Sequence, residues 1–113
     1  MCLLLDASTE SAEQSWIDFL NEGSGVYHCD KYPLILKKDN LFFHECDISD
    51  YNQVKNLSEM FTDKSITFNS IINNARINLN TSIEDITLEQ WDKVMKTNVY
   101  GTFYVTKLFY IPF

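Results

Sequence analysis

The sequence has little basic charge and no concentration of it. Nine Lys and Arg residues stand against sixteen Asp and Glu residues, so the net charge of the 113-residue chain is −7. A protein that binds nucleic acid needs clustered Lys and Arg to replace the counterions of the phosphate backbone. No such cluster occurs, and we therefore expect neither nucleic acid nor an anionic membrane surface to be a partner.

Long hydrophobic segments are also missing. No apolar run is long enough to span a bilayer. The run at residues 2–5 is too short for the core of a signal peptide, and no basic residue precedes it. We expect a cytoplasmic location, in which the three cysteines stay reduced. There is no internal repeat, low-complexity tract or linker, so residues 1–113 are expected to form one domain.

The composition that is present is globular, with 45% hydrophobic and 14% aromatic residues. Short apolar runs at 2–5, 26–29, 41–47 and 66–72 read as strands. Segments of helical periodicity follow the first, third and fourth runs. The apolar stripe of the first segment is Ala12, Trp16, Phe19 and Leu20, and that of the second is Val54, Leu57 and Phe61. The stripe of the last segment is a line from Trp91 to Phe109. Strands that alternate with helices predict parallel pairing and right-handed crossovers. The expected fold class is α/β, a doubly wound parallel sheet of about four strands with flanking helices.

The last helix carries a polar residue in its apolar stripe. Thr87-Leu88-Glu89-Gln90 has the capping-box pattern that begins a helix. At the helical period one line of residues then lies together: Trp91, Met95, Asn98, Thr102, Val105 and Phe109. An unpaired buried amide costs roughly 1–3 kcal/mol, so either Asn98 bonds a neighbouring backbone carbonyl or the face opens there onto a cleft or water. Gly101, beside this line, indicates close packing of another element.

Residues 41–107 contain several motifs in a fixed order: Asp47, then Asn73-Asn74-Ala75-Arg76, then Trp91, Asn98 and Gly101. Taken in this order, they resemble the short-chain dehydrogenase/reductase family. Asp47 looks like the family's adenine-contacting aspartate, and Asn73-Asn74-Ala75-Arg76 is similar to its Asn-Asn-Ala-Gly signature. Trp91, Asn98 and Gly101 fit its pattern Trp-x6-Asn-x2-Gly. The resemblance implies a Rossmann-like domain and NAD(P)-dependent hydride transfer between a carbonyl and an alcohol.

The resemblance also implies roles for single residues. Asn98, the only candidate at a catalytic position, would hold a water of the proton relay. The candidates on the cofactor side are Asp30, Asp47, Asn73, Asn74 and Ala75. Arg76 replaces the last glycine of the signature, where it either obstructs the nicotinamide side or offers a cation to phosphate, and the sequence leaves both open.

The phosphate-binding turn departs from the family. Residues 5–12 align with its Thr-Gly-Ala-Ser-x-Gly-Ile-Gly turn, but the glycine positions hold Asp6, Glu10 and Ala12. Glycines let the backbone approach the pyrophosphate at the helix N-terminus. Two unit charges about 4 Å apart repel by about 4 kcal/mol at an effective dielectric of 20, so Asp6 and Glu10 disfavour a phosphate there. The sequence predicts a retained fold with weakened or lost phosphate binding.

Asp30 bears on the choice of cofactor. An acid at the end of the second strand accepts hydrogen bonds from the ribose hydroxyls and repels a 2′-phosphate. If a dinucleotide binds, NAD is therefore expected rather than NADP. The alternative is a solvated aspartate at a strand end.

The resemblance implies a catalytic serine and a Tyr-x3-Lys pair well beyond Asn98, but only 15 residues follow Asn98 in this sequence. Tyr27-x3-Lys31 and Tyr51-x3-Lys55 match the spacing but lie on other elements, and we interpret both as chance. The 113 residues are thus expected to be an incomplete, truncated domain without turnover of its own. An apolar C-terminal helix without a neighbour predicts self-association. A non-catalytic remnant that acts as a binding module is the main alternative.

Two other classes of site are weaker. His28, Cys29, His44 and Cys46 are metal-ligand types, but adjacent strand residues point to opposite faces and the spacing fits no zinc pattern, so no metal is expected. A phosphoacceptor receiver domain is the remote alternative, because Asp6 and Asp47 end strands and Lys107 comes late. It leaves the Asn-Asn-Ala motif unexplained.

Overall fold

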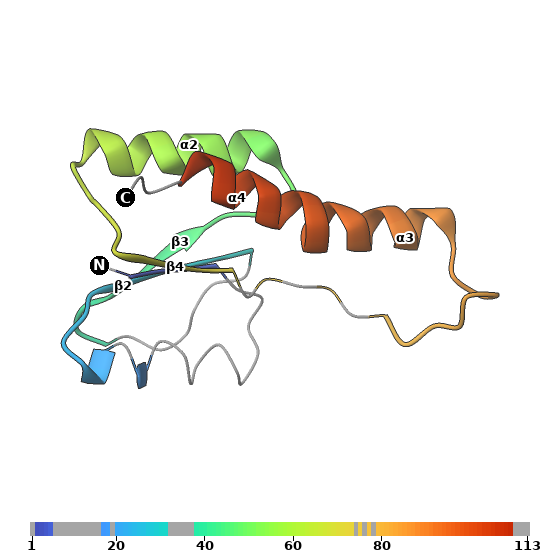
Figure 1. Cartoon of the computed structure of the whole chain (residues 1–113), viewed down its shortest axis with the longest axis horizontal. Coiled ribbons are helices and arrows are strands. Elements are labelled where there is room, and N and C mark those ends of the chain that lie inside the picture. Colours follow the sequence, from blue (N-terminus) through green and yellow to red (C-terminus); the bar gives the residue numbers. More distant parts are fainter. Residues whose placement is uncertain are drawn as a thin grey trace.

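The computed structural model describes residues 2–5 (backbone only), 17–18, 20–31, 38–73, 75, 77 and 79–109. Its elements follow in the order β1 (Cys2–Leu5), β2 (Val26–Asp30), β3 (Leu41–Glu45), α2 (Tyr51–Asp63), β4 (Ser70–Asn73), α3 (Leu88–Met95), η1 (Lys96–Gly101) and α4 (Thr102–Leu108). The segment η1 is a π-helix that joins α3 to α4, so the last three elements form one continuous rod (Figure 1). None of the described helices is long and apolar enough to cross a membrane.

The described strands form one parallel sheet in the order β3-β2-β1-β4. The chain moves outward from β1 through β2 to β3 and then returns to the other side of β1. This is the doubly wound Rossmann order, whereas a receiver domain has the order 2-1-3-4-5. The predicted α/β class is confirmed, and the receiver hypothesis is wrong.

One face of the sheet is covered by helices α2 and α4, and the helical turn around residues 17–21 lies on the other face (Figure 1). The predicted stripe Val54, Leu57 and Phe61 is the buried side of α2. These side chains meet Tyr27 and Cys29 of β2 in one apolar cluster. The spacing of three and four residues places them on one helix face, which explains why this sequence is helical here.

The smaller cluster on the opposite face centres on Val26, with Ile17, Leu20, Leu41 and Ile72 packed around it. The predicted helix stop is confirmed, because Gly23 has a positive φ of 85° and its N–H donates to the Leu20 carbonyl at 3.0 Å. The remaining positions of the predicted first stripe, Ala12, Trp16 and Phe19, lie outside the described residues.

Two strand boundaries differ from the prediction. The third strand ends at Glu45, two residues before Asp47, and the fourth begins at Ser70 rather than at residue 66. After Ser65, whose φ is 56°, the Ile66 N–H donates to the Phe61 carbonyl at 2.9 Å and closes the end of α2. Residues 66–69 are therefore a connection whose apolar side chains pack on the core, and the apolar run alone did not separate this from a strand.

The C-terminal rod begins with the predicted capping box, since Thr87 and Gln90 exchange both hydrogen bonds. Its buried line differs from the expected one. Thr97, Gly101, Val105 and Phe109 are buried at intervals of four residues, whereas Trp91 is 49% exposed. The prediction for Trp91 is wrong because α3 extends past the edge of the sheet, where there is no face to cover (Figure 1).

Candidate functional site

The carboxyl ends of parallel strands share one rim, and this rim carries most of the candidate residues. Asp30 ends β2, Asp47 follows β3, and Asn73 ends β4. Segment η1 contacts the chain that leaves β3 and the chain that leaves β4, as two sets of contacts at Asn98 and Gly101 show. A π-helical turn inside an α-helix is often found at a functional site.

Asn98 is bonded through both ends of its amide to a single residue. Its Oδ1 accepts the Ile77 N–H at 2.7 Å, and its Nδ2 donates to the Ile77 carbonyl at 2.8 Å. The sequence-based expectation of a bond to a backbone carbonyl is therefore correct, and the side chain also satisfies the N–H. Because both ends of the amide are used, the Asn98 side chain holds the loop after β4 in place.

The backbone around Asn98 departs from α-helical bonding. The Thr102 N–H donates to the Val99 carbonyl, and the Thr102 hydroxyl donates to the Asn98 carbonyl at 3.3 Å. The carbonyl of Asn98 thus faces a side-chain hydroxyl, which can be exchanged for another donor more readily than a helical N–H.

Gly101 provides the second attachment of η1. A Cβ at this position would lie 2.7 Å from Cδ1 and 2.8 Å from Cγ1 of Ile48, and 3.2 Å from its carbonyl oxygen. No side chain fits without a shift of Ile48, so the close packing predicted at Gly101 is confirmed. This contact brings the connection between β3 and α2 against the same helical turn that carries Asn98.

Asp47 organises the turn that leads into α2. Its Oδ1 accepts the Ser49 N–H at 3.0 Å and the Ser49 hydroxyl at 2.7 Å, and its own N–H donates to Gln53 Oε1 at 2.8 Å. The side chain is half-buried. One carboxylate oxygen therefore has a structural role in this turn.

The signature after β4 is described in part. Asn73 is exposed at the end of the strand, and its Nδ2 donates to Thr106 Oγ1 of α4 at 3.5 Å. Ala75 packs against the main apolar cluster. Asn74 and Arg76 lie outside the described residues, as do Asp6, Glu10 and Ala12 of the predicted phosphate turn.

Asp30 is 4% exposed at the end of β2, so the alternative of a solvated strand-end aspartate is wrong. Its backbone carbonyl accepts the Cys46 N–H at 2.9 Å, and its Oδ2 lies 4.0 Å from Nε2 of His28. His28 is 2% exposed. Burial lowers the pKa of His28, and the nearby Asp30 carboxylate opposes this shift.

Other reactive side chains of β2 and β3 belong to the core. Tyr27 stacks on Phe42 with ring centroids 4.8 Å apart, in agreement with the interpretation of its Tyr-x3-Lys spacing as chance. Burial raises the pKa of the Cys46 thiol to about 12 and also raises the pKa of Cys29, so both stay protonated at neutral pH. Among the described residues, no three His, Cys, Asp or Glu side chains are grouped as a metal site.

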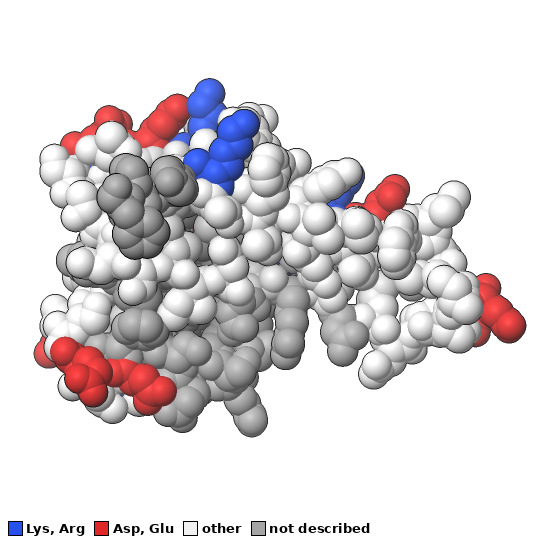
Figure 2. Space-filling view, viewed as in Figure 1, with Lys and Arg blue, Asp and Glu red and all other residues white. Residues whose placement is uncertain are grey.

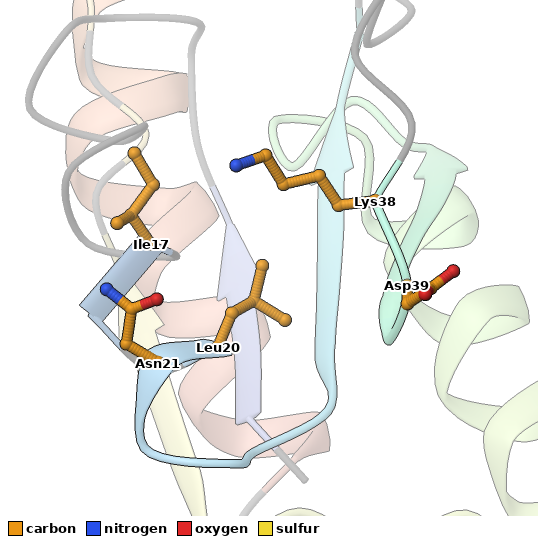
Figure 3. Close-up of a pocket in the computed structure, with 5 residues that line it drawn as sticks. All are labelled: Ile17, Leu20, Asn21, Lys38 and Asp39. Atoms are coloured by element: carbon orange, nitrogen blue, oxygen red, sulfur yellow. The ribbon is translucent and has the colours of Figure 1, made fainter.

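A hollow of about 540 Å³ lies away from this rim. Figure 3 shows its lining by Ile17, Leu20, Asn21, Lys38 and Asp39. Leu20 packs against the first residue of β2, and Lys38 and Asp39 come just before β3. The hollow is therefore at the amino ends of the strands, which in doubly wound sheets is opposite the ligand-binding edge.

With this geometry in view, the chain can be compared with known proteins. A family model described as short chain dehydrogenase matches residues 28–112. The chain belongs to the short-chain dehydrogenase family. An uncharacterized oxidoreductase of Saccharomyces cerevisiae is 27% identical over 71 residues, which cover 63% of this chain and 23% of that protein.

Solved structures of short-chain dehydrogenases share the fold. A member from Leptospira borgpetersenii with bound NAD+ superposes with a TM-score of 0.89 at 20% identity, covering 95% of this chain and 43% of that one. An NADPH-bound carbonyl reductase from chicken fatty liver gives a TM-score of 0.81 at 19% identity, covering 96% and 49%. The chain spans about a quarter of the yeast relative and less than half of either structure.

Three residues at this rim were not singled out from the sequence: Ile48, Ile77 and Thr106. Ile77 contributes only backbone groups, which carry no chemical signal in a sequence. A signal did exist for Ile48, because a glycine inside a helix indicates that some neighbour is close, although it does not say which one.

Proposed function

We propose that this chain is the cofactor-binding part of an NAD-dependent short-chain dehydrogenase, and that residues 1–113 form one incomplete Rossmann-like domain. The observation that carries the proposal is the pair of hydrogen bonds between Asn98 and Ile77. These bonds fix the loop after β4 at the rim where doubly wound sheets bind dinucleotides.

The described residues fit one half of the cofactor. Asp30 is a buried acid at the end of β2, suited to accept hydrogen bonds from the ribose hydroxyls of adenosine. Asp47 would lie at the adenine, and Asn73, Asn74 and Ala75 would line the path toward the nicotinamide. When bound, the nicotinamide supplies or accepts the hydride that converts a carbonyl to an alcohol or the reverse.

Asn98 acts in this proposal as the residue that sets the position of the loop. Its side chain is committed to Ile77, so a water of the proton relay would bond its main-chain carbonyl, in exchange for the Thr102 hydroxyl. The serine and the Tyr-x3-Lys pair of the family have no counterpart at the expected positions of these 113 residues. We therefore propose that the chain alone binds a dinucleotide without turnover.

The test is a titration of the full chain with NAD and with NADP, in which binding is monitored by the fluorescence of Trp16 and Trp91. Saturable binding is expected, with NAD bound more tightly than NADP. Asp30→Asn should weaken NAD binding by roughly tenfold, the loss of a charged hydrogen bond. Asp39→Asn is the matched control, because Asp39 is exposed at the opposite end of the sheet and its loss should have no effect.

The second candidate function is a non-catalytic binding module, and the acidic residues at the glycine positions favour it. If the fluorescence shows no saturable change up to roughly millimolar NAD, any binding free energy is smaller than about 4 kcal/mol. Only the second candidate function would then remain.

Self-association of the chain is expected under both candidate functions. The C-terminal rod exposes large apolar side chains, namely Leu88, Trp91, Val99, Tyr100 and Phe103, of which Leu88 is 85% and Phe103 57% exposed. On the face that Figure 2 shows, the surface over the C-terminal rod carries few charged side chains. Apolar surface of this kind favours contact with a second copy. A monodisperse monomer in light scattering would contradict it. The cytoplasmic location inferred from the sequence stays a prediction.

A further inference from the structure

His28 is a buried polar side chain with 2% of its surface exposed. Within the part of the chain that the structure describes, neither Nδ1 nor Nε2 has a hydrogen-bond partner. A neutral imidazole carries one donor and one acceptor, and both are normally paired in an interior. The packed neighbour in register on β3 is Phe43, whose ring meets the imidazole edge-on at a centroid distance of 6.1 Å. A polar side chain kept in such surroundings calls for a reason other than packing.

The nearest charge is the acid that we assign to the cofactor ribose. His28 and Asp30 are two residues apart on β2 and point to the same face, and Nε2 lies 4.0 Å from Oδ2. This gap is too long for a hydrogen bond but short enough for a strong charge–charge interaction inside a protein. The protonation state of the imidazole therefore contributes to the electrostatic field at the Asp30 carboxylate.

Four other ionisable residues of the described segments are relevant to this face: Glu45, Lys31, Lys38 and Asp18. Glu45 of β3 is the register partner of Asp30 and is exposed. Lys31 follows Asp30 in the sequence and Lys38 lines the hollow at the amino ends of the strands, while Asp18 is exposed on the helical turn that covers this face. In register on β1 lies Leu4, and the Asp30 carboxylate is the charge that opposes the lowering of the His28 pKa.

We propose that His28 is a positioning residue for cofactor specificity. As a neutral ring it adds no positive charge beside the Asp30 carboxylate, which selects a 2′-hydroxyl, and as a cation it offsets part of the carboxylate charge and admits a 2′-phosphate. This inference rests on the proposed dinucleotide site. It concerns a residue outside the cofactor-contacting set, which acts only through Asp30.

The direction with pH follows from the surroundings. Burial lowers the pKa of His28 below its usual value of 6.5, so the ring is neutral at pH 7.5 and gains a proton only below pH 6.5. The preference for NAD over NADP should therefore be largest at neutral pH and should decrease as the pH falls below 6.5.

The first test measures the dissociation constants of NAD and NADP for the full chain at pH 7.5 and pH 5.5. Wild type should lose roughly tenfold of its preference for NAD on acidification, a typical size for coupling between two sites. The 2′-phosphate itself has a pKa of about 6 and adds a change of its own. His28→Gln, which keeps a polar side chain but cannot ionise, should show that smaller change only. An equal loss of preference in wild type and His28→Gln would overturn the inference.

The second test needs no cofactor. The two histidine rings of the full chain are titrated by NMR in wild type and in Asp30→Asn. The pKa of His28 should fall further when the carboxylate is removed, while His44, whose ring stacks with Tyr27 on the other face, should not change. An unchanged His28 pKa would overturn the inference. If the His28 pKa responds to Asp30→Asn but the chain binds neither NAD nor NADP, the proposed function is refuted, and the role of His28 in specificity is refuted with it.

Discussion

The two faces of strand β2 are equally buried but are used differently. Tyr27 and Cys29 point into the larger cluster under α2 and α4, where aromatic rings meet edge to face. Val26, His28 and Asp30 point to the opposite face, and two of these three side chains are polar. Because alternate residues of one strand share the same backbone, the difference comes from what each face must contact and not from the strand itself.

The comparison separates stability from function along a single strand. An apolar face is stabilised by burial and is sensitive to lost volume. A polar buried face costs free energy wherever its groups lack partners, and it persists where those groups have another use. Substitutions on the two faces should therefore have different signatures, which the following predictions use.

The largest effect is expected on the apolar face. Phe61 is 2% exposed and its ring contacts Tyr27, His44, Phe68 and Phe109. Phe61→Ala should lower the free energy of unfolding by about 3–5 kcal/mol, measured by urea denaturation. Phe42→Ala is the control, since Phe42 is 42% exposed and should cost less than half as much. Equal losses at the two positions would place the centre of the core elsewhere.

The next effect tests the attachment of η1 to the connection after β3. Gly101→Ala places a Cβ within 2.7 Å of Ile48 and should destabilise by about 1–3 kcal/mol through overpacking. Ile48→Ala removes the atoms that would clash. In a double-mutant cycle the cost of Gly101→Ala should therefore largely vanish in the Ile48→Ala background. Additive losses would mean that the two residues do not share this contact.

The rim attachment at Asn98 should show a somewhat smaller effect. Asn98→Ala leaves the Ile77 N–H and carbonyl without their partners and should cost about 1–2 kcal/mol by urea denaturation, because water can replace part of the pairing at this half-buried site. Asn98→Asp keeps the acceptor and loses the donor, so it should fall between wild type and Asn98→Ala. Hydrogen exchange of the Ile77 amide should accelerate in Asn98→Ala, and an unchanged rate would contradict the attachment.

The fold followed from the sequence where apolar spacing and end signals agreed. Val54, Leu57 and Phe61 recur at helical spacing, Thr87 and Gln90 cap a helix, and these positions were predicted correctly. The strand at 66–72 failed because Ile66 and Phe68 are apolar for packing from a connection, which periodicity does not distinguish from strand pairing over so short a run.

At the rim, the sequence singled out the polar residues and Gly101, but not the neighbours that they contact. A buried amide needs partners, so a bond from Asn98 to a backbone carbonyl could be expected, but its partner Ile77 could not, because any residue offers the same N–H and carbonyl. The burial of Asp30 was likewise not predictable, because it depends on what packs around the end of β2 in the folded sheet. The exposure of Trp91 depends on where the sheet ends, and no local sequence pattern predicts this.

The smallest effect returns to the polar face of β2 and concerns pH. Burial lowers the pKa of His28 and of His44 below 6.5, so the unfolded chain binds more protons than the folded one in mild acid. Stability should therefore be complete above pH 6.5 and decline as the pH falls below it. His28→Leu removes one of the two contributions, along with two unpaired nitrogens, so it should match or exceed wild type at pH 7.5 and decline less by pH 5.5. Urea denaturation at the two values measures this, and parallel declines would assign the whole pH dependence to His44 or to carboxylates.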